Sequence, residues 1–115
     1  MHHFDSALSA KYVHSDLSPE EGIACVKRFS QHSVVSFTNE LTYEGYKDVP
    51  TSYLFCDADA CVLPIAQQRG IDVIEKASGR KVDVTKIHSD HCPNISHPEE
   101  VVKWFVDLVE KGGRE

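Results

Sequence analysis

The amino-acid sequence predicts an α/β fold, in which a short parallel sheet is flanked by helices and preceded by a helical segment. Residues 51–56 and 81–87 have the composition and alternation of β-strands. An apolar pattern of helical period over residues 64–78 joins them, and a last helix follows a loop over residues 88–97. A strand that reaches the next strand through a helix implies a parallel pair with a right-handed crossover.

Length, composition and charge place the chain in a broad class. The 115 residues are 41% hydrophobic and 26% charged, as is usual for one globular domain, which we expect over residues 1–115. The net charge of −6 has the wrong sign for binding nucleic acid. No apolar run is long enough to cross a membrane, and the first residues lack a signal-peptide pattern. Four cysteines without a CxxC pair favour reduced thiols. We therefore expect a cytoplasmic protein that binds neither nucleic acid nor membrane.

The first half of the chain contains helical signals and no predicted strand. The motif Ser18-Pro19-Glu20-Glu21 is a capping box with proline at the first helical position, which predicts a helix over residues 19–30. Two further short helices are expected over residues 32–38 and 43–47. We expect these pieces to form a lid-like helical unit within residues 12–48.

The second half, residues 49–111, contains the predicted strand–helix–strand–helix unit. Pro64 suits the first position of its first helix, and Gly79 suits the position just after the last turn. The motif Ser96-His97-Pro98-Glu99 is a second capping-box pattern and predicts the start of the last helix. The apolar positions expected to face the core are Ile65, Ile71, Val73, Ile74 and Ala77 in the first helix and Val101, Val102, Phe105, Leu108 and Val109 in the last.

Two parallel strands are too few for an independent sheet. Parallel sheets are normally covered on both faces and rarely consist of two strands alone. Open strand edges with apolar flanks tend to bind other polypeptide. We therefore expect the chain to be structurally incomplete by itself and to form a homodimer or to bind a complementing chain.

Candidate catalytic residues follow the two predicted strands. Asp59 comes just after the first strand, and His91 lies in the loop after the second. The carboxyl ends of adjacent parallel strands lie side by side, so these two side chains could meet. An aspartate bonded to one ring nitrogen fixes the histidine tautomer and leaves the other nitrogen for proton transfer. The alternatives are that Asp57 and Asp59 cap loop amides and that His91 is an ordinary loop histidine.

Two other kinds of site use the same loops. His88, His91, Cys92 and His97 are possible metal ligands, but they lie in one short loop with no second ligand group elsewhere. We therefore expect no metal and no other cofactor. A nucleophilic cysteine is a further alternative, with Cys61 a better candidate than Cys92 because Cys92 is adjacent in sequence to His91.

Five segments carry a family resemblance: Asp16–Glu21, Val49–Asp59, Leu63–Pro64, Ser89–Pro93 and Ser96–Val101. Together they resemble the C-terminal portion of α/β-hydrolases, most closely the small microbial and fungal members related to salicylate-type esterases and hydroxynitrile lyases. The resemblance covers residues 12–111. It implies a truncated α/β-hydrolase-like layer, in which Asp59 is the acid and His91 the histidine of a catalytic triad. It also implies that the N-terminal helical segment is the end of a lid.

The sequence also departs from that family. The nucleophile elbow G-x-S-x-G does not occur in these 115 residues. The early strands and the loop that supply oxyanion-hole amides in the family are not found either. The resemblance therefore does not imply that this chain alone hydrolyses esters.

Three functions remain open. The first is a non-hydrolytic enzyme, active as a homodimer, in which His91 and Asp59 perform general acid–base chemistry on a small organic molecule. Cyclisation, elimination or an aldol-type step in a biosynthetic pathway would suit it. The second is the C-terminal fragment of a serine ester hydrolase that needs an N-terminal chain, and the third is a non-catalytic binding or assembly module. The residues expected to line the apolar substrate pocket are Phe29, Phe37, Tyr43 and Tyr46.

Overall fold

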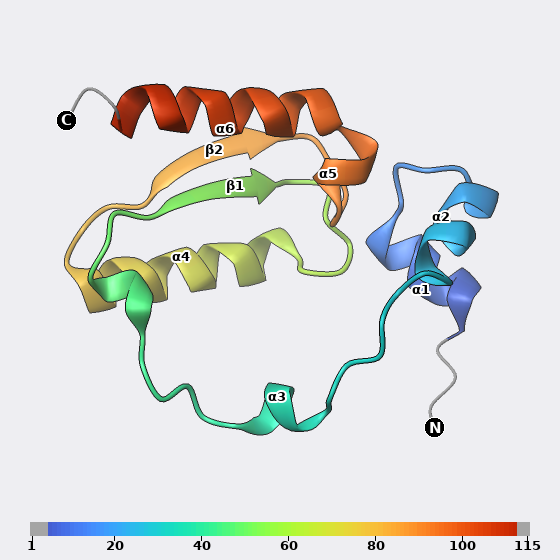
Figure 1. Ribbon diagram of the computed structural model, residues 1–115, viewed down its shortest axis with the longest axis horizontal. Coiled ribbons are helices and arrows are strands. Elements are labelled where there is room, and N and C mark those ends of the chain that lie inside the picture. Colours follow the sequence, from blue (N-terminus) through green and yellow to red (C-terminus); the bar gives the residue numbers. More distant parts are fainter. Residues whose placement is uncertain (1–4, 113–115) are drawn as a thin grey trace.

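A parallel pair of strands between two long helices forms the centre of the computed structural model, which describes residues 5–112 (Figure 1). Strands β1 and β2 pair in register from Ser52 opposite Asp83 to Cys56 opposite Ile87. This pairing confirms the predicted α/β class and the parallel arrangement. In chain order the elements are α1 (Ser6–Val13), α2 (Pro19–Val26), α3 (Val35–Thr38), the 3-10 helix η1 (Gly45–Lys47), β1 (Ser52–Cys56), α4 (Pro64–Ser78), β2 (Asp83–Ile87), α5 (Pro93–Ser96) and α6 (Pro98–Gly112).

The two long helices cover opposite faces of the sheet, with α4 on one side and α6 on the other (Figure 1). A small core lies between β1 and α4, where Phe55, Ile71 and Val82 are buried and Tyr53 and Ile74 pack against them. Phe55 and Tyr53 are two residues apart and therefore face the same side of the strand. This period-2 pattern is what directs one face of β1 toward α4.

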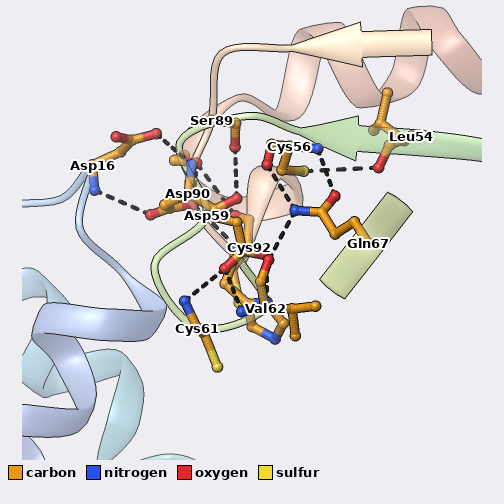
Figure 2. Close-up of polar contacts among 12 residues, drawn as sticks. Asp16, Leu54, Cys56, Asp59, Cys61, Val62, Gln67, Ser89, Asp90 and Cys92 are labelled. Carbon is orange, nitrogen blue, oxygen red and sulfur yellow. Dashed lines mark hydrogen bonds and ion pairs between the residues drawn. The ribbon is translucent and has the colours of Figure 1, made fainter. Parts of the chain in front are cut away.

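A buried glutamine holds the end of β1 and the loop that follows. Gln67 of α4 accepts a hydrogen bond from the Cys56 amide at 3.1 Å and donates to the Cys56 carbonyl at 2.8 Å. Its side-chain amide also donates to the Val62 carbonyl at 2.9 Å. One side chain thus satisfies backbone groups at both ends of the loop over residues 57–61 (Figure 2).

Helices α1 and α2 pack closely on each other at the N-terminal end of the described chain. The capping box predicted at the start of α2 is confirmed, because the Ser18 hydroxyl accepts from the Glu21 amide and the Glu21 carboxylate accepts from the Ser18 amide. A Cβ added to Gly22 would lie 3.2 Å from the Cβ of Ala10, so glycine permits this close approach of the two helices. Figure 1 places the pair beyond the carboxyl ends of the strands, next to α5.

Several expected helices differ from those observed. Helix α1 was not predicted, and α2 ends at Val26 although the sequence predicted a helix to residue 30. The expected helices over residues 32–38 and 43–47 are reduced to the four-residue α3 and the single turn η1. The connection between α2 and β1 buries no residue from Lys27 to Pro50, so it lacks the tertiary packing that stabilises short helices.

The start of the last helix also needs correction. Helix α6 begins at Pro98, so the residue before it is His97, and Ser96 does not form the predicted capping box. The Ser96 hydroxyl instead donates to the Asp90 carboxylate at 2.9 Å. Proline at the first helical position fixes the start of α6 one residue later than the motif predicted.

The apolar faces of α4 and α6 are less buried than the sequence predicted. In α4, Ile71 is buried, while Ile65 and Val73 are more than half exposed. In α6, where a buried stripe was predicted, Val102, Phe105 and Val109 are each more than half exposed. The two-stranded sheet is too narrow to cover both helices. None of the helices described over residues 5–112 is long and apolar enough to cross a lipid bilayer.

Candidate active site

Asp59 and His91 meet at the carboxyl ends of the two strands. Nδ1 of His91 lies 2.9 Å from Oδ2 of Asp59. Oδ1 of the same carboxylate accepts hydrogen bonds from the amides of Cys61 and Val62, both at 2.8 Å (Figure 2). Asp59 is only 6% exposed. Its carboxylate is therefore held in one orientation, by two amides of its own loop on one oxygen and by the imidazole on the other.

The parallel register explains why the two loops meet. Beyond the last strand pair, the Asp57 amide still donates to the Ile87 carbonyl at 3.1 Å, so both chains leave the sheet at the same level. The chain after β1 then turns back, with the Asp59 amide 3.4 Å from the Cys56 carbonyl. This turn directs Asp59 toward the loop that follows β2, where His91 lies.

The arrangement is suited to proton transfer at the outer ring nitrogen. An ionised carboxylate accepts hydrogen bonds only, so Asp59 favours the His91 tautomer with hydrogen on Nδ1. Among residues 5–112, Nε2 of His91 has no hydrogen-bond partner, and the side chain is 35% exposed. Nε2 is thus available to accept a proton, and Asp59 stabilises the imidazolium that results.

A second histidine–aspartate pair lies in the same loops but is open to solvent. Nδ1 of His88 lies 2.7 Å from Oδ1 of Asp57, and these side chains are 86% and 48% exposed. Exposed pairs of this kind are weak and are screened by solvent. His88 and Asp57 therefore provide a natural comparison for the partly buried His91–Asp59 pair.

A buried carboxylate next to His91 was not predicted from the sequence. Asp90 is fully buried and accepts three hydrogen bonds, from the Asp16 amide at 3.1 Å, the Cys92 amide at 3.0 Å and the Ser96 hydroxyl at 2.9 Å. In return, Asp16 accepts a hydrogen bond from the Asp90 amide at 2.8 Å (Figure 2). The partners are 74 residues apart, and no local pattern in the sequence could have indicated this pairing.

The cysteines near the site are protonated thiols at neutral pH. Burial, together with the negative charges of Asp90 and Asp59, raises the pKa of Cys92 to about 11. Burial and Asp59 also raise the pKa of Cys61. Because the thiolate is the nucleophile, these surroundings disfavour the alternative of a nucleophilic cysteine.

The possible metal ligands in the loop that follows β2 make other contacts. His88 lies beside Asp57, and Nδ1 of His97 lies 2.9 Å from the Ser96 hydroxyl and 3.6 Å from the Asp16 carboxylate. Between residues 5 and 112, no cluster of three or more histidine, cysteine, aspartate or glutamate side chains has the geometry to hold a metal ion.

The four aromatic residues expected to line a pocket have separate surroundings. Phe29 lies beside His14, and Phe37 packs against His32 with ring centroids 4.6 Å apart. The Tyr43 hydroxyl donates to Asp48. Phe29, Phe37 and Tyr43 are more than half exposed, and Tyr46 is partly buried in η1. An apolar pocket enclosed by these four side chains therefore stays a prediction.

A groove of about 440 Å³ lies between β2 and α6, away from the pair. Thr85 and Ile87 line it from the strand, and Trp104 and Leu108 line it from the helix. The indole Nε1 of Trp104 is buried without a hydrogen-bond partner among the described residues. His91 and Asp59 do not line this groove, so it is not the space in front of Nε2.

Comparison with known proteins gives two relatives. The chain is 39% identical over 107 residues to a protein of a Phoma species named probable hydrolase R7, a match that covers 93% of this chain and 44% of that protein. The chain is similar to hydrolase-like proteins. It is also 31% identical over 110 residues to norfluorocurarine synthase 2 of a Strychnos species, which covers 90% of this chain and 39% of that protein. The chain thus spans less than half the length of the curated relatives it matches. No protein-family model matches it.

Proposed function

We propose that His91 and Asp59 are the general acid–base pair of a hydrolase-related enzyme that acts on a small organic molecule. The observation that carries the proposal is the buried Asp59 carboxylate, fixed by two amides and placed 2.9 Å from Nδ1 of His91. The similarity to a protein named as a probable hydrolase supports the class of enzyme.

In the proposed reaction, Nε2 of His91 accepts a proton from a hydroxyl or carbon acid and later returns it to the leaving group or product. Asp59 stabilises the imidazolium while that proton is held. General acid–base catalysis of this kind typically contributes about 10²- to 10⁴-fold in rate. No step needs a cysteine nucleophile, which agrees with the raised pKa values of Cys61 and Cys92.

We further propose that a second polypeptide completes the site. The motif G-x-S-x-G is not found in the 115 residues, so a serine nucleophile in that setting would have to come from elsewhere. Val102, Phe105 and Val109 of α6 form an exposed apolar surface that such a polypeptide could cover. A complementing chain and a second copy of this chain are the two candidates.

Two reaction types use the same pair. With a complementing chain that carries a nucleophile, the pair would serve ester hydrolysis, as the similarity to the probable hydrolase suggests. In a homodimer with no added nucleophile, His91 would transfer a substrate proton directly. The similarity to a protein named as a synthase favours this second type.

The test measures cleavage of p-nitrophenyl acetate by three preparations. They are this chain, the portion of the Phoma protein that this chain does not match, and the two co-expressed. We expect activity in the co-expressed pair, because only there are the acid–base pair and the remaining residues combined. His91→Gln and Asp59→Asn should each lower kcat at least about 100-fold.

His88→Gln is the matched control, because His88 lies on the same loop and contacts an aspartate in the same way but is exposed. It should leave kcat unchanged. Full activity of His91→Gln in an active preparation would contradict the proposal. A stable complex without esterase activity would instead favour the non-hydrolytic reaction.

A further inference from the structure

Asp90, which precedes His91 in the sequence, is the most completely buried charged residue among residues 5–112. Asp90 is 0% exposed, and its carboxylate is surrounded by donors. Oδ1 accepts from the Cys92 amide and the Ser96 hydroxyl, and Oδ2 accepts from the Asp16 amide. A buried carboxylate is unfavourable unless its oxygens meet donors, and here three donors meet it. The backbone on both sides of His91 is thereby fixed.

Asp16 in turn accepts a hydrogen bond from the backbone of Asp90. It lies in the turn between α1 and α2, and its Oδ2 accepts the Asp90 amide at 2.8 Å. The two aspartates therefore exchange two hydrogen bonds, each from the backbone of one residue to the side chain of the other. Figure 2 shows Asp16 facing Asp90 from the N-terminal part of the chain.

The segment that connects α2 to β1, residues 27–50, contains no buried side chain. Gly22 of α2 lies against Ala10 of α1, and Nδ1 of His97 lies 3.6 Å from the Asp16 carboxylate. The reciprocal bonds between Asp16 and Asp90 are thus a specific link between the helix pair and the loop of His91.

We infer that Asp90 is a positioning residue for His91 and that Asp16 is its partner, which fastens the α1–α2 helix pair beside the acid–base pair. This inference rests on the proposed function. Asp90 itself does not touch a reacting atom; it holds the loop so that His91 reaches Asp59. Misplacement of a catalytic group by about 1 Å can cost about 100-fold in rate, so such a link has consequences for catalysis.

The chemistry of the two carboxylates predicts that their amide variants differ. In Asp90→Asn, an NH₂ group must face at least one donor in either orientation, because both oxygens of Asp90 accept hydrogen bonds. In Asp16→Asn, the remaining oxygen can take the place of Oδ2 and still accept the Asp90 amide, since Oδ1 of Asp16 has no donor among the described residues. Asp90→Asn should therefore be the more disruptive variant.

The experiment uses NMR on the full 115-residue chain and needs no substrate. In Asp90→Asn, we expect amide hydrogen exchange at Asp16 to be at least about tenfold faster, and the His91 Nδ1–H signal to broaden. In Asp16→Asn, exchange at Asp90 should change less than about threefold, whereas Asp16→Ala should raise it at least about tenfold. Asp57→Asn, a change in the exposed pair, is the control and should leave all of these signals unchanged.

Activity provides a second, separate readout. In any active preparation, Asp90→Asn should lower kcat at least about tenfold with little change in KM, and Asp16→Asn should have a smaller effect. A His91 Nδ1–H signal that is unchanged in a folded Asp90→Asn protein would overturn the positioning role. Equal effects of the two amide variants would overturn the proposed pattern of acceptors. If His91→Gln kept full activity, the proposed function would fail while the exchange results would still test the link.

Discussion

Asp59 and Asp90 share a feature that defines the site at the scale of single residues. Each is a buried carboxylate, and each directs both oxygens at donors from the loops around it. Asp59 has a ring nitrogen among its partners and so orients the proposed catalytic histidine, whereas the donors to Asp90 within residues 5–112 are backbone amides and a hydroxyl, which hold the loop. The two roles follow from the identity of the partners.

The same carboxylates determine the reactivity of Cys92. Burial and the charges of Asp90 and Asp59 raise its pKa to about 11. Since only the thiolate is alkylated, the rate of reaction of Cys92 with iodoacetamide should rise by about tenfold per pH unit up to about pH 10. The measurement is mass spectrometry of the labelled peptide, with a peptide thiol, whose rate levels off near pH 9, as reference. If the alkylation rate of Cys92 levelled off below about pH 9, burial and the two carboxylates would not raise its pKa as stated.

The proximity of Asp59 and His91 could be predicted from the sequence, because parallel strands bring their carboxyl ends together and each residue follows its strand by a few positions. The link between Asp16 and Asp90 could not. It joins two irregular loops 74 residues apart, and neither hydrophobic periodicity nor a capping pattern marks it.

At the scale of elements, two glycines of the α4 region differ in backbone conformation. The residue after the last turn, Gly79, has a conformation that favours glycine, whereas Gly70 has ordinary helical geometry. Gly79 ends the helix with φ of 68°, in the left-handed region, while Gly70 lies inside the helix with open space where a Cβ would be. Gly79→Ala should lower the free energy of unfolding by about 1 kcal/mol. Gly70→Ala should raise it by about 0.5–1 kcal/mol, since alanine is the better helix former.

Chemical denaturation of both variants measures these changes, and each serves as the control for the other. Both substitutions add one methyl group to the same helix, so a general effect of size would have the same sign in both. Destabilisation of equal size at Gly70 and Gly79 would contradict the role of the left-handed conformation.

Elements with local signals were predictable, and those that depend on distant contacts were not. The bounds of α4 follow from Pro64 and Gly79, and β1 follows from a short apolar run. The sequence predicted the start of α6 one residue too early. The Ser96 hydroxyl, which the motif predicted to cap the helix, donates to Asp90 instead. Helix α1 begins at a conventional cap, Asp5, which accepts from the Ala7 and Leu8 amides, but its weak apolar pattern gave no signal.

At the scale of the whole molecule, the structure is open. Its accessible surface is 8772 Å², whereas a compact monomer of 12.9 kDa exposes roughly 6,300 Å². The radius of gyration of 16.2 Å also exceeds the value of about 13 Å for a compact domain of this length. The exposed face of α6 accounts for part of this surface. The amphipathic pattern of α6 predicted a buried stripe, but the two strands are too few to bury it.

The openness of the structure and the partial match to longer relatives both support the proposal that a second polypeptide completes the site. The chain matches less than half the length of two relatives. Within residues 5–112, the proposed acid–base pair is oriented by a hydrogen bond, and the raised pKa of Cys92 disfavours that thiol as a nucleophile. The sequence predicted that the sheet would be incomplete, since two parallel strands leave edges and faces open. It could not indicate which polypeptide would cover them in the proposed complex.

The tautomer of His91 tests the central proposal most directly, and long-range ¹H–¹⁵N NMR of the imidazole at about pH 8 measures it. We predict hydrogen on Nδ1 and a free lone pair on Nε2. In Asp59→Asn, the amides of Cys61 and Val62 should hold the side-chain oxygen and turn the NH₂ group toward His91, so the hydrogen should move to Nε2. A wild-type His91 with hydrogen on Nε2, or one that does not respond to Asp59→Asn, would contradict the proposal that Asp59 prepares His91 for proton transfer.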